Sequence, residues 1–542
     1  MDSSKIIIYQ VLPRLYGNKC PTRKPDGTIE ENGCGKMNDF TPTVLRRLRE
    51  AGFSHVWFTG ILRHATTTDY SHCGIPRQHP AVVKGRAGSP YAIADYYDVD
   101  PDLAVNTDRR MEEFERLVAR THRARLKVVI DFVPNHVARQ YHSICKPQGV
   151  HDLGEDDNPD VGFDPARNNF YYCPGQPFTP YFDLYHGESE PYKEFPAKAT
   201  GNDCFHNAPG RSDWYETVKL NYGVDYYTGG TGHFDPIPST WHKMLHILCF
   251  WAEKGVDAFR CDMAEMVPTE FWTWATAQVR RLHPNVVFIG EVYNPALYRR
   301  YLQAGFDYLY DKVGMYDTLI DVVCHRRNVG AITQAWQQND DIRRHMLYFL
   351  ENHDEQRLAS DFVAGDGMKA LPAVAVAMLL QQNPFMLYFG QEWGERGMDN
   401  EGFSGCDGRT TIFDYWALTP HDSTSALYEA YRKLLHIAHT EKAVAEGTSF
   451  DLMYVNPHCE RQYAFLRKVG DNVLLVVVNF DDSSADTELF IPSHAFDYLE
   501  MLERPYKATD LLGGSTQKLL LVRDQTIAVS LPPRGVVVWR LE

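Results

Sequence analysis

Short runs of residues that are apolar on both faces recur along the chain, and they alternate with segments in which apolar residues repeat every three to four positions. Such runs are typical of parallel strands covered by helices. Eight of them occur, at 5–12, 55–61, 127–134, 255–262, 286–293, 306–312, 346–354 and 385–394. Helical periodicity is clearest at 41–52 and 109–126. The alternation predicts an α/β fold, a (β/α)8 barrel of the TIM type.

Two segments interrupt this repeat. Residues 138–225 are rich in Gly, Pro, Asn, Asp and Tyr and are too long for an ordinary loop, so they predict a subdomain inserted after the third strand. After about residue 445, alternating runs such as NVLLVVVNF and TIAVSL predict a C-terminal antiparallel β-sandwich. The predicted domains are the first part of the barrel (1–137), the insertion (138–225), the rest of the barrel (226–444) and the C-terminal β domain (445–542).

Polar residues close several of the predicted strands. Active sites of such barrels form at the carboxyl ends of the strands, where these side chains meet. They are Asp131, Asn135, His136, Arg260, Asp262, Glu291, His353 and Asp354. Arg260 and Asp262 are two residues apart in a strand and therefore share a face, so the arginine is expected to keep the aspartate ionised.

Each of these residues also has an ordinary structural interpretation. An acid at a strand end is more often a helix cap or a solvated loop residue, and a single histidine more often makes a local hydrogen bond. The pair Arg260–Asp262 could be a purely structural ion pair. The same chemistry at several strand ends of one barrel favours an active site instead.

Four segments, DFVPNH, AFRCD, GEVY and ENHD, resemble in order and spacing the four sequence regions of the α-amylase superfamily, glycoside hydrolase family 13. The resemblance covers nearly the whole chain. It implies that Asp262 is the nucleophile, Glu291 the general acid/base and Asp354 a third carboxylate that binds sugar hydroxyls. It also implies that Arg260 orients the nucleophile.

The resemblance further identifies residues that bind the sugar. His136 and His353 would hydrogen-bond the sugar in the cleavage subsite. The segment GSPYAIADYY (88–97) is similar to a loop that supplies a stacking tyrosine, which makes Tyr91 the sugar platform. Because GSP signals a loop, we expect Tyr91 to lie outside the core.

Glycoside cleavage needs one protonated and one ionised carboxyl group. Glu291 lies between apolar neighbours, whereas Asp262 has Arg260 beside it, so Glu291 is expected to have the higher pKa. A retaining mechanism is expected, with the two carboxyl groups about 5 to 5.5 Å apart. No cofactor is required for this chemistry.

The resemblance leaves calcium binding open. Many family members hold a structural calcium ion through the asparagine of the first region, here Asn135, together with residues of the insertion. The acidic run GEDDNPD (154–160) could contribute ligands or could be a solvated loop. The N-terminal segment EENGCGKMND has few acids where relatives often carry an Asp-rich calcium loop.

The expected function is hydrolysis of α-1,4 bonds in starch-derived glucans or maltooligosaccharides. TVKLN (217–221) is similar to a region of neopullulanases and cyclomaltodextrinases, so cyclodextrin and pullulan are also candidate substrates. The alternatives are transglycosylation or a trehalose synthase-like isomerisation through the same intermediate, and hydrolysis of α-1,6 bonds. A noncatalytic glycan-binding barrel would be expected to lack a carboxylate, and all three are present.

Composition excludes several other classes. The net charge is −16, with 55 Lys and Arg against 71 Asp and Glu, which disfavours a nucleic-acid partner. No apolar run reaches the ~20 residues that span a membrane. Eleven cysteines without regular spacing indicate neither a zinc site nor a disulfide framework, and Cys249 and Cys261 are expected to be buried thiols. The apolar stretch in the first residues is too short for a signal peptide, so a cytoplasmic location is expected, or a secreted or periplasmic one if a leader precedes this sequence.

Overall fold

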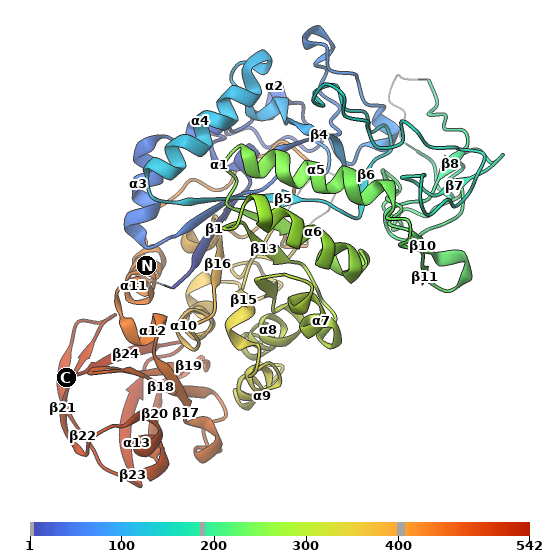
Figure 1. The fold of residues 1–542 in the computed structure, drawn as a ribbon. Coiled ribbons are helices and arrows are strands. Elements are labelled where there is room, and N and C mark those ends of the chain that lie inside the picture. The colour runs from blue at the N-terminus through green and yellow to red at the C-terminus, as the bar shows by residue number, and fades with distance from the viewer. Residues whose placement is uncertain (1–4, 185–189, 398–406) are drawn as a thin grey trace.

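The computed structural model describes residues 5–184, 190–397 and 407–542. Its centre is a closed barrel of eight parallel strands, in the order β1-β16-β15-β14-β13-β12-β5-β2 (Figure 1). Each strand lies within one of the eight predicted runs, so the predicted barrel is confirmed. The strands are β1 (Ile7–Val11), β2 (His55–Phe58), β5 (Lys127–Phe132), β12 (Ala258–Cys261), β13 (Val287–Gly290), β14 (Tyr308–Tyr310), β15 (Met346–Phe349) and β16 (Phe385–Tyr388).

Helices surround the barrel, as their periodicity predicts. The first, α3 (Pro42–Ala51), begins where the Thr41 side chain accepts a hydrogen bond from the Val44 N–H, and ends at Gly52, whose φ of 109° favours glycine. The others are α4 (Arg110–Arg123), α5 (Ser239–Glu253), α6 (Thr269–Leu282), α7 (Tyr298–Gln303), α8 (Asp317–Val323), α9 (Gly330–Gln338), α10 (Leu371–Leu379) and α11 (Ala426–Thr440). Three one-turn helices, α1 (Pro13–Tyr16), α2 (Ile29–Asn32) and α12 (Lys442–Ala445), complete this part.

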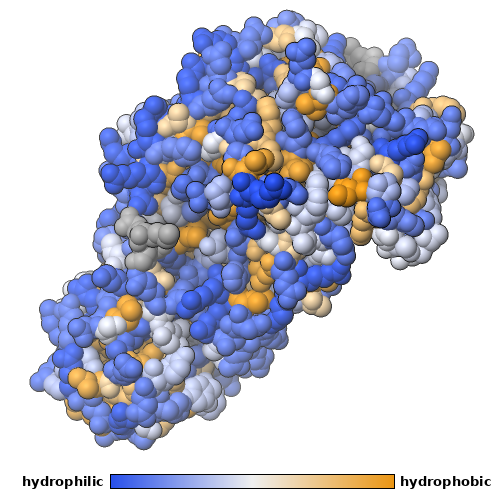
Figure 2. Space-filling model, viewed as in Figure 1, coloured by the Kyte–Doolittle hydropathy of each residue, from blue (hydrophilic) through white to orange (hydrophobic). Residues whose placement is uncertain are grey.

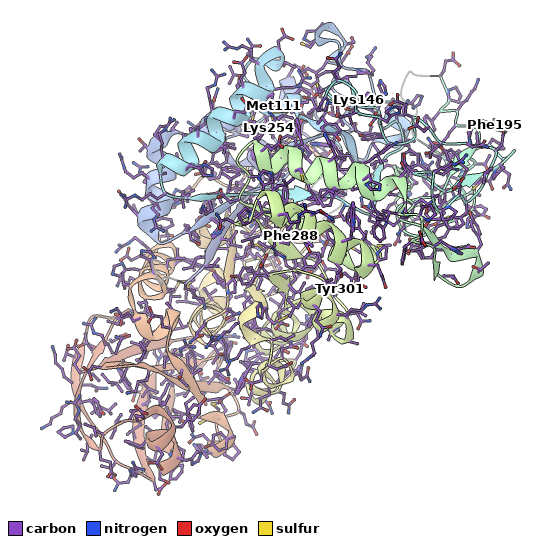
Figure 3. All side chains as sticks on the ribbon, in the orientation of Figure 1. Met111, Lys146, Phe195, Lys254, Phe288 and Tyr301 are labelled. Carbon is purple, nitrogen blue, oxygen red and sulfur yellow. The ribbon has the colours of Figure 1, made fainter. Side chains whose placement is uncertain are left out.

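Apolar side chains fill the space between barrel and helices. In β5, the five residues after Lys127 are all buried, as expected for a strand covered on both faces. Phe288 on β13 and Tyr301 on α7 belong to this layer, and both are nearly inaccessible to solvent (Figure 3). By contrast, Phe195 is exposed at the outer edge of the insertion.

The insertion after β5 consists of short strand pairs and loops, and extends to one side of the barrel in Figure 1. It contains β7 (Tyr172–Cys173) paired with β8 (Ala197–Lys198), and ends near β10 (Val224–Asp225), which pairs with β11 (Thr231–Gly232). β9 (Thr217–Lys219) returns to pair with β6 (His136–Ala138), directly after β5. A second, smaller interruption that the sequence did not predict is the antiparallel pair β3 (Leu62–His64) and β4 (Ile93–Val99).

The C-terminal region is antiparallel, as predicted. Six strands form one sheet in the order β17-β18-β19-β24-β21-β22, and β20 pairs with β23. The elements are β17 (Thr448–Asp451), β18 (Gln462–Val469), β19 (Asn472–Asn479), β20 (Ala485–Ile491), α13 (Ser493–Leu499), β21 (Arg504–Asp510), β22 (Thr516–Leu521), β23 (Gln525–Leu531) and β24 (Val536–Leu541). Buried Arg467 ties this region to the barrel by donating to the carbonyls of Leu380 and Ala443.

Polar residues predominate on the face shown in Figure 2, where apolar residues form only small separate groups. Among the described residues, no helix has the length and apolarity that a membrane crossing requires. The ten cysteines in the described ranges are free thiols. Cys261 is buried as expected, whereas Cys249 on α5 is only partly buried because it lies at the edge of the helix–barrel contact.

Candidate active site

Arg260 and Asp262 lie together at the carboxyl end of β12, as their spacing predicts. The guanidinium Nη1 is 2.8 Å from Asp262 Oδ1. In the sheet, Arg260 is the register partner of Asp131 on β5, and its Nη1 is also 3.5 Å from Asp131 Oδ1. The alternation of side chains along a strand thus places a cation and two carboxylates at one barrel mouth.

The same guanidinium also reaches Glu291, the first residue after β13. Arg260 Nη2 is 2.8 Å from Glu291 Oε2. One fully buried arginine therefore bridges Asp262 and Glu291 through different nitrogen atoms. Planar guanidinium groups suit such double contacts with carboxylates.

Aromatic rings enclose the guanidinium. Its central carbon lies 5.3 Å from the ring centroids of Trp57 and Tyr91, and 5.5 Å from that of Tyr310. Burial disfavours the positive charge, but Glu291 and the other acidic neighbours outweigh this effect and raise the pKa of Arg260. Arg260 is therefore a permanent cation at the centre of the cluster.

The charge environment of Asp262 differs from the expected one. Burial raises the pKa of Asp262 well above its usual value, Arg260 opposes this, and Glu291 and Asp354 add to the increase. The expectation that Arg260 keeps the pKa of Asp262 low is wrong, because burial and the neighbouring carboxylates outweigh a guanidinium that is shared with Glu291. With three acids around one cation, the cluster can hold a proton on one carboxyl while another stays ionised.

Glu291 is held by donors on both oxygens. The Tyr293 hydroxyl donates to Oε1 over 2.6 Å, and the Met263 N–H donates to Oε2 over 2.8 Å. Met263 adopts a left-handed backbone conformation, with φ 43° and ψ 43°, immediately after Asp262. Such conformations are uncommon for residues other than glycine and concentrate at functional sites. Here the turn directs the amide of Met263 at Glu291.

Asp354 is the exposed member of the three carboxylates. Its side chain is 43% exposed, and Oδ2 lies 3.0 Å from Nε2 of buried His353. Burial opposes ionisation, but His353 and Arg260 outweigh it and lower the pKa of Asp354. An ionised, accessible carboxylate at the barrel mouth can accept hydrogen bonds from sugar hydroxyls.

Tyr91 lies in the cluster but is not an open platform. Its ring is 8% exposed and stacks on the ring of His353, with the centroids 5.0 Å apart. Its hydroxyl lies 2.6 Å from His353 Nε2 and donates to Asp131 Oδ1 over 3.3 Å. The expectation that Tyr91 lies outside the core is wrong, because its ring packs on His353 and beside the Arg260 guanidinium.

We expect Tyr91→Ala to reduce the free energy of unfolding by about 3–5 kcal/mol, because it removes a buried aromatic ring. Tyr91→Phe keeps the ring and loses only the hydroxyl contacts, so its cost should be near 1 kcal/mol. Urea unfolding of both variants measures the difference. An alanine variant as stable as the wild type would show that the ring is not part of the core.

Sequence reasoning missed several residues of the cluster. Gln10 on β1 contacts His353, with its Nε2 2.9 Å from Nδ1. Trp57 on β2 donates from Nε1 to Asp131 Oδ2 over 3.0 Å. Tyr293 could have been found, because it lies two residues after Glu291 and so on the same side of an extended segment. Gln10 and Trp57 lie inside apolar runs and carry no comparable signal.

Residues 29–444 match the family described as alpha amylase, catalytic domain, and residues 454–542 match the alpha amylase C-terminal all-beta domain. The chain belongs to the α-amylase family. It is thus an α-amylase family glycoside hydrolase that acts on α-glucans.

Individual relatives of this amylase-family chain are distant. Alpha-amylase 3 of Dictyoglomus thermophilum is 23% identical over 72% of this chain and 74% of its own length. Neopullulanase 2 of Thermoactinomyces vulgaris is 21% identical over 99% of this chain and 78% of its own. The solved α-amylase of Geobacillus thermoleovorans, complexed with acarbose, shares the fold with a TM-score of 0.66 at 17% identity, covering 100% of this chain and 99% of its own.

Asn135, which the sequence suggested as a calcium ligand, is already engaged by other groups. Asn135 donates from Nδ2 to the Gly201 carbonyl, and its Oδ1 accepts a hydrogen bond from Lys219 Nζ on β9. The same ammonium is 2.7 Å from Asp203 Oδ1 and 3.4 Å from the Met266 carbonyl oxygen. Amide, carboxylate and carbonyl oxygens are the ligands that calcium takes. Because a buried lysine already engages them, this donor set does not fit a calcium ion.

Other acidic groups do not supply an alternative. In the run 154–160, Asp157 accepts the N–H groups of Asn169 and Phe170, and Glu155 pairs with Lys146. One further group with metal-like spacing occurs among the described residues, formed by Asp95, Asp98 and Cys145. Arg63 and Arg110 already pair with its two carboxylates.

His136 is beside this lysine. Burial lowers the pKa of His136 to about 3, and the charges of Lys219 and Lys84 add to the effect. Its ring is therefore neutral, and its Nδ1 lies 3.1 Å from Asn135 Nδ2 at the start of β6. A neutral imidazole at this position can hydrogen-bond a sugar hydroxyl.

We expect neither EDTA nor added calcium to change the melting temperature of the wild-type enzyme, because Lys219 supplies the cation. Lys219→Met should lower it by several degrees, since Asn135 and Asp203 lose their partner. Differential scanning calorimetry measures both. Lys127→Met, which removes a more exposed lysine paired with Asp257, is the control and should have little effect. A chelator-induced drop in the wild type would contradict the assignment.

Proposed function

We propose that this enzyme hydrolyses α-1,4-glucosidic bonds of starch-derived glucans and maltooligosaccharides with retention of configuration, through a covalent glycosyl-enzyme intermediate. The observation that supports the proposal most strongly is the buried Arg260, which bridges Asp262 and Glu291 at the barrel mouth. A double displacement needs two carboxyl groups close together, one as nucleophile and one as acid/base. Asp262 and Glu291 meet this need, and Asp354 is a third carboxylate at the barrel mouth.

In the first step, Asp262 attacks the anomeric carbon while Glu291 protonates the departing glycosidic oxygen. The bond to the leaving sugar breaks as the bond to Asp262 forms. In the second step, Glu291 takes a proton from water, and the resulting hydroxide displaces Asp262 from the sugar. Two inversions return the α configuration.

The other residues position the sugar. Asp354 is ionised and accessible, so it accepts hydrogen bonds from ring hydroxyls. His136 is buried and can hydrogen-bond the sugar in the cleavage subsite, whereas His353 acts there through Asp354 and Tyr91, because its ring nitrogens already contact these residues and Gln10. Tyr91 supports His353 by stacking on its ring. The carboxyl separation of about 5 to 5.5 Å remains a prediction.

Proton NMR of the first product from maltoheptaose tests the mechanism. We expect the α-anomer to appear first, followed by mutarotation; initial β-anomer would exclude the covalent route. Parallel incubations with β-cyclodextrin, pullulan, sucrose and isomaltose define the bond and chain preference. Longer oligosaccharides formed from maltoheptaose alone would show that transfer to sugar competes with hydrolysis, because both start from one intermediate.

A further inference from the structure

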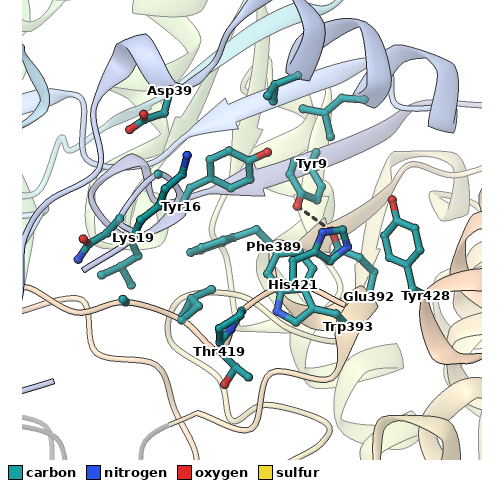
Figure 4. A pocket seen from close by; sticks show the side chains of 18 of the residues that line it. Tyr9, Tyr16, Lys19, Asp39, Phe389, Glu392, Trp393, Thr419, His421 and Tyr428 are labelled. Carbon is teal, nitrogen blue, oxygen red and sulfur yellow. Dashed lines mark hydrogen bonds between the residues drawn. The ribbon is translucent and has the colours of Figure 1, made fainter. Parts of the chain in front are cut away.

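A cavity of about 920 Å³ lies apart from the catalytic cluster, between the first and last barrel helices, α3 and α11 (Figure 4). Loop residues after β1 and before α11 close its other sides. None of the seven candidate catalytic and sugar-binding residues lines it. Its volume is in the range of ~300–1,000 Å³ that is typical of small-molecule sites.

Strand β1 separates this cavity from the active site. Gln10 points into the barrel, where it contacts His353. The preceding residue, Tyr9, points the opposite way and lines the cavity, as alternation along a strand requires. The two sites therefore occupy opposite faces of the same strand.

Part of the cavity lining is polar. The Tyr9 hydroxyl donates to Glu392 Oε1 over 2.7 Å, and the Gly390 N–H donates to Oε2 over 3.1 Å. Glu392 is 8% exposed, burial raises its pKa to about 7, and within the described residues no cation pairs with it. The neighbouring Trp393 has a buried indole N–H that lacks a partner among the described residues. Two adjacent lining residues, Glu392 and Trp393, thus supply a buried acid and an unpartnered donor.

Aromatic rings form one wall. The Trp393 and His421 ring centroids are 4.8 Å apart, and His421 is 4.7 Å from Tyr428. Tyr16 lines the cavity from the β1 side (Figure 4). Ring faces of this kind can pack on the apolar C–H face of a pyranose, while Tyr hydroxyls and the indole N–H contact its polar edge.

The geometry points to a second carbohydrate site, in which this cavity binds a neutral short oligosaccharide. A sugar hydroxyl both donates and accepts, so one ligand group can serve Glu392 and another Trp393 Nε1. An amine would leave the indole N–H unused, and an aliphatic ligand would leave both groups unused. The residues that line the cavity carry charges of both signs, namely Lys19, Arg47 and Asp39, and this balance favours a neutral ligand. The choice of an α-glucan rests on the proposed function.

Calorimetric titration of maltotriose into Glu291→Gln, which cannot turn the ligand over, tests the site. We expect two binding events for each chain. A second substitution is then added, either Trp393→Phe, which keeps a ring but removes the N–H, or Glu392→Gln. Each should raise the dissociation constant of one binding event at least tenfold and leave that of the other unchanged. Tyr498→Ala, which removes an exposed ring on α13, is the control and should leave both events intact.

Tryptophan fluorescence gives a second readout that does not depend on fitting two sites. Maltotriose should change the emission of Glu291→Gln, and Trp393→Phe should remove part of that change. A single binding event in Glu291→Gln, or two events that survive both cavity substitutions, would overturn the inference. Hydrolysis of maltoheptaose by the wild type tests the proposed function separately. If the wild type is active but Glu291→Gln shows one binding event, only the second carbohydrate site is refuted. If the wild type is inactive but Glu291→Gln shows two binding events, only the proposed function is refuted.

Discussion

Replacing Asp262 with asparagine is expected to lower turnover of maltoheptaose by at least about a thousandfold, with little change in the melting temperature. The amide cannot form the covalent bond to the anomeric carbon. Asp262 packs next to Arg260, and an isosteric amide preserves this packing. Steady-state kinetics and calorimetry measure the two effects.

A smaller residue at this position allows a sharper test. In Asp262→Gly, added azide can occupy the vacated space and attack the anomeric carbon while Glu291 protonates the leaving oxygen. We expect azide to restore part of the activity and to give a β-glycosyl azide, because only one inversion occurs. Asp354→Asn should also be slow, but azide should not rescue it. Asp262→Asn with a tenth of wild-type activity would refute the nucleophile assignment.

Removing the shared guanidinium should have the second largest effect. Arg260→Met leaves Asp131, Asp262 and Glu291 buried together without a cation, which should cost about 3–5 kcal/mol of unfolding free energy. Turnover should fall at least about a hundredfold, because Asp262 loses the guanidinium that orients it. Urea unfolding and kcat measure the two losses.

Two variants separate charge from geometry. Arg260→Lys keeps a positive charge but cannot contact two carboxylates through two nitrogens of one planar group, so we expect it to regain stability more than activity. Arg467→Met removes another fully buried arginine, whose contacts are barrel and C-terminal carbonyls. It should lower stability with kcat unchanged. An active Arg260→Met enzyme would show that Arg260 is only structural.

The barrel could be predicted because its signal is local. Each strand run is apolar on both faces, and the closing polar residues follow from where the runs end. The pair Arg260–Asp262 needed only the two-residue period of a strand. These features depend on neighbours in sequence, and the structure confirms the eight strands and this contact.

The features that could not be predicted depend on contacts between segments that are distant in the sequence. Arg260 reaches Glu291 because β12 and β13 are adjacent in the sheet, and no pattern within either run shows that the guanidinium is shared. Lys219 meets Asn135 across 84 residues through the β6–β9 pair, which the irregular insertion concealed. Tyr91 follows a loop signal yet is buried, because the loop packs on His353, 262 residues away.

Barrel closure has a consequence for synthesis. β1 pairs on one side with β2 and on the other with β16, which begins at Phe385. At a synthesis rate of ~5–20 residues per second, roughly 20 to 75 seconds of translation separate β1 from β16. During that time one edge of β1 has no strand partner from the barrel, and neither Gln10–His353 nor Tyr9–Glu392 can form until the later residue has been made. Until the last strand of the barrel emerges, this edge of β1 is open to pairing with other chains.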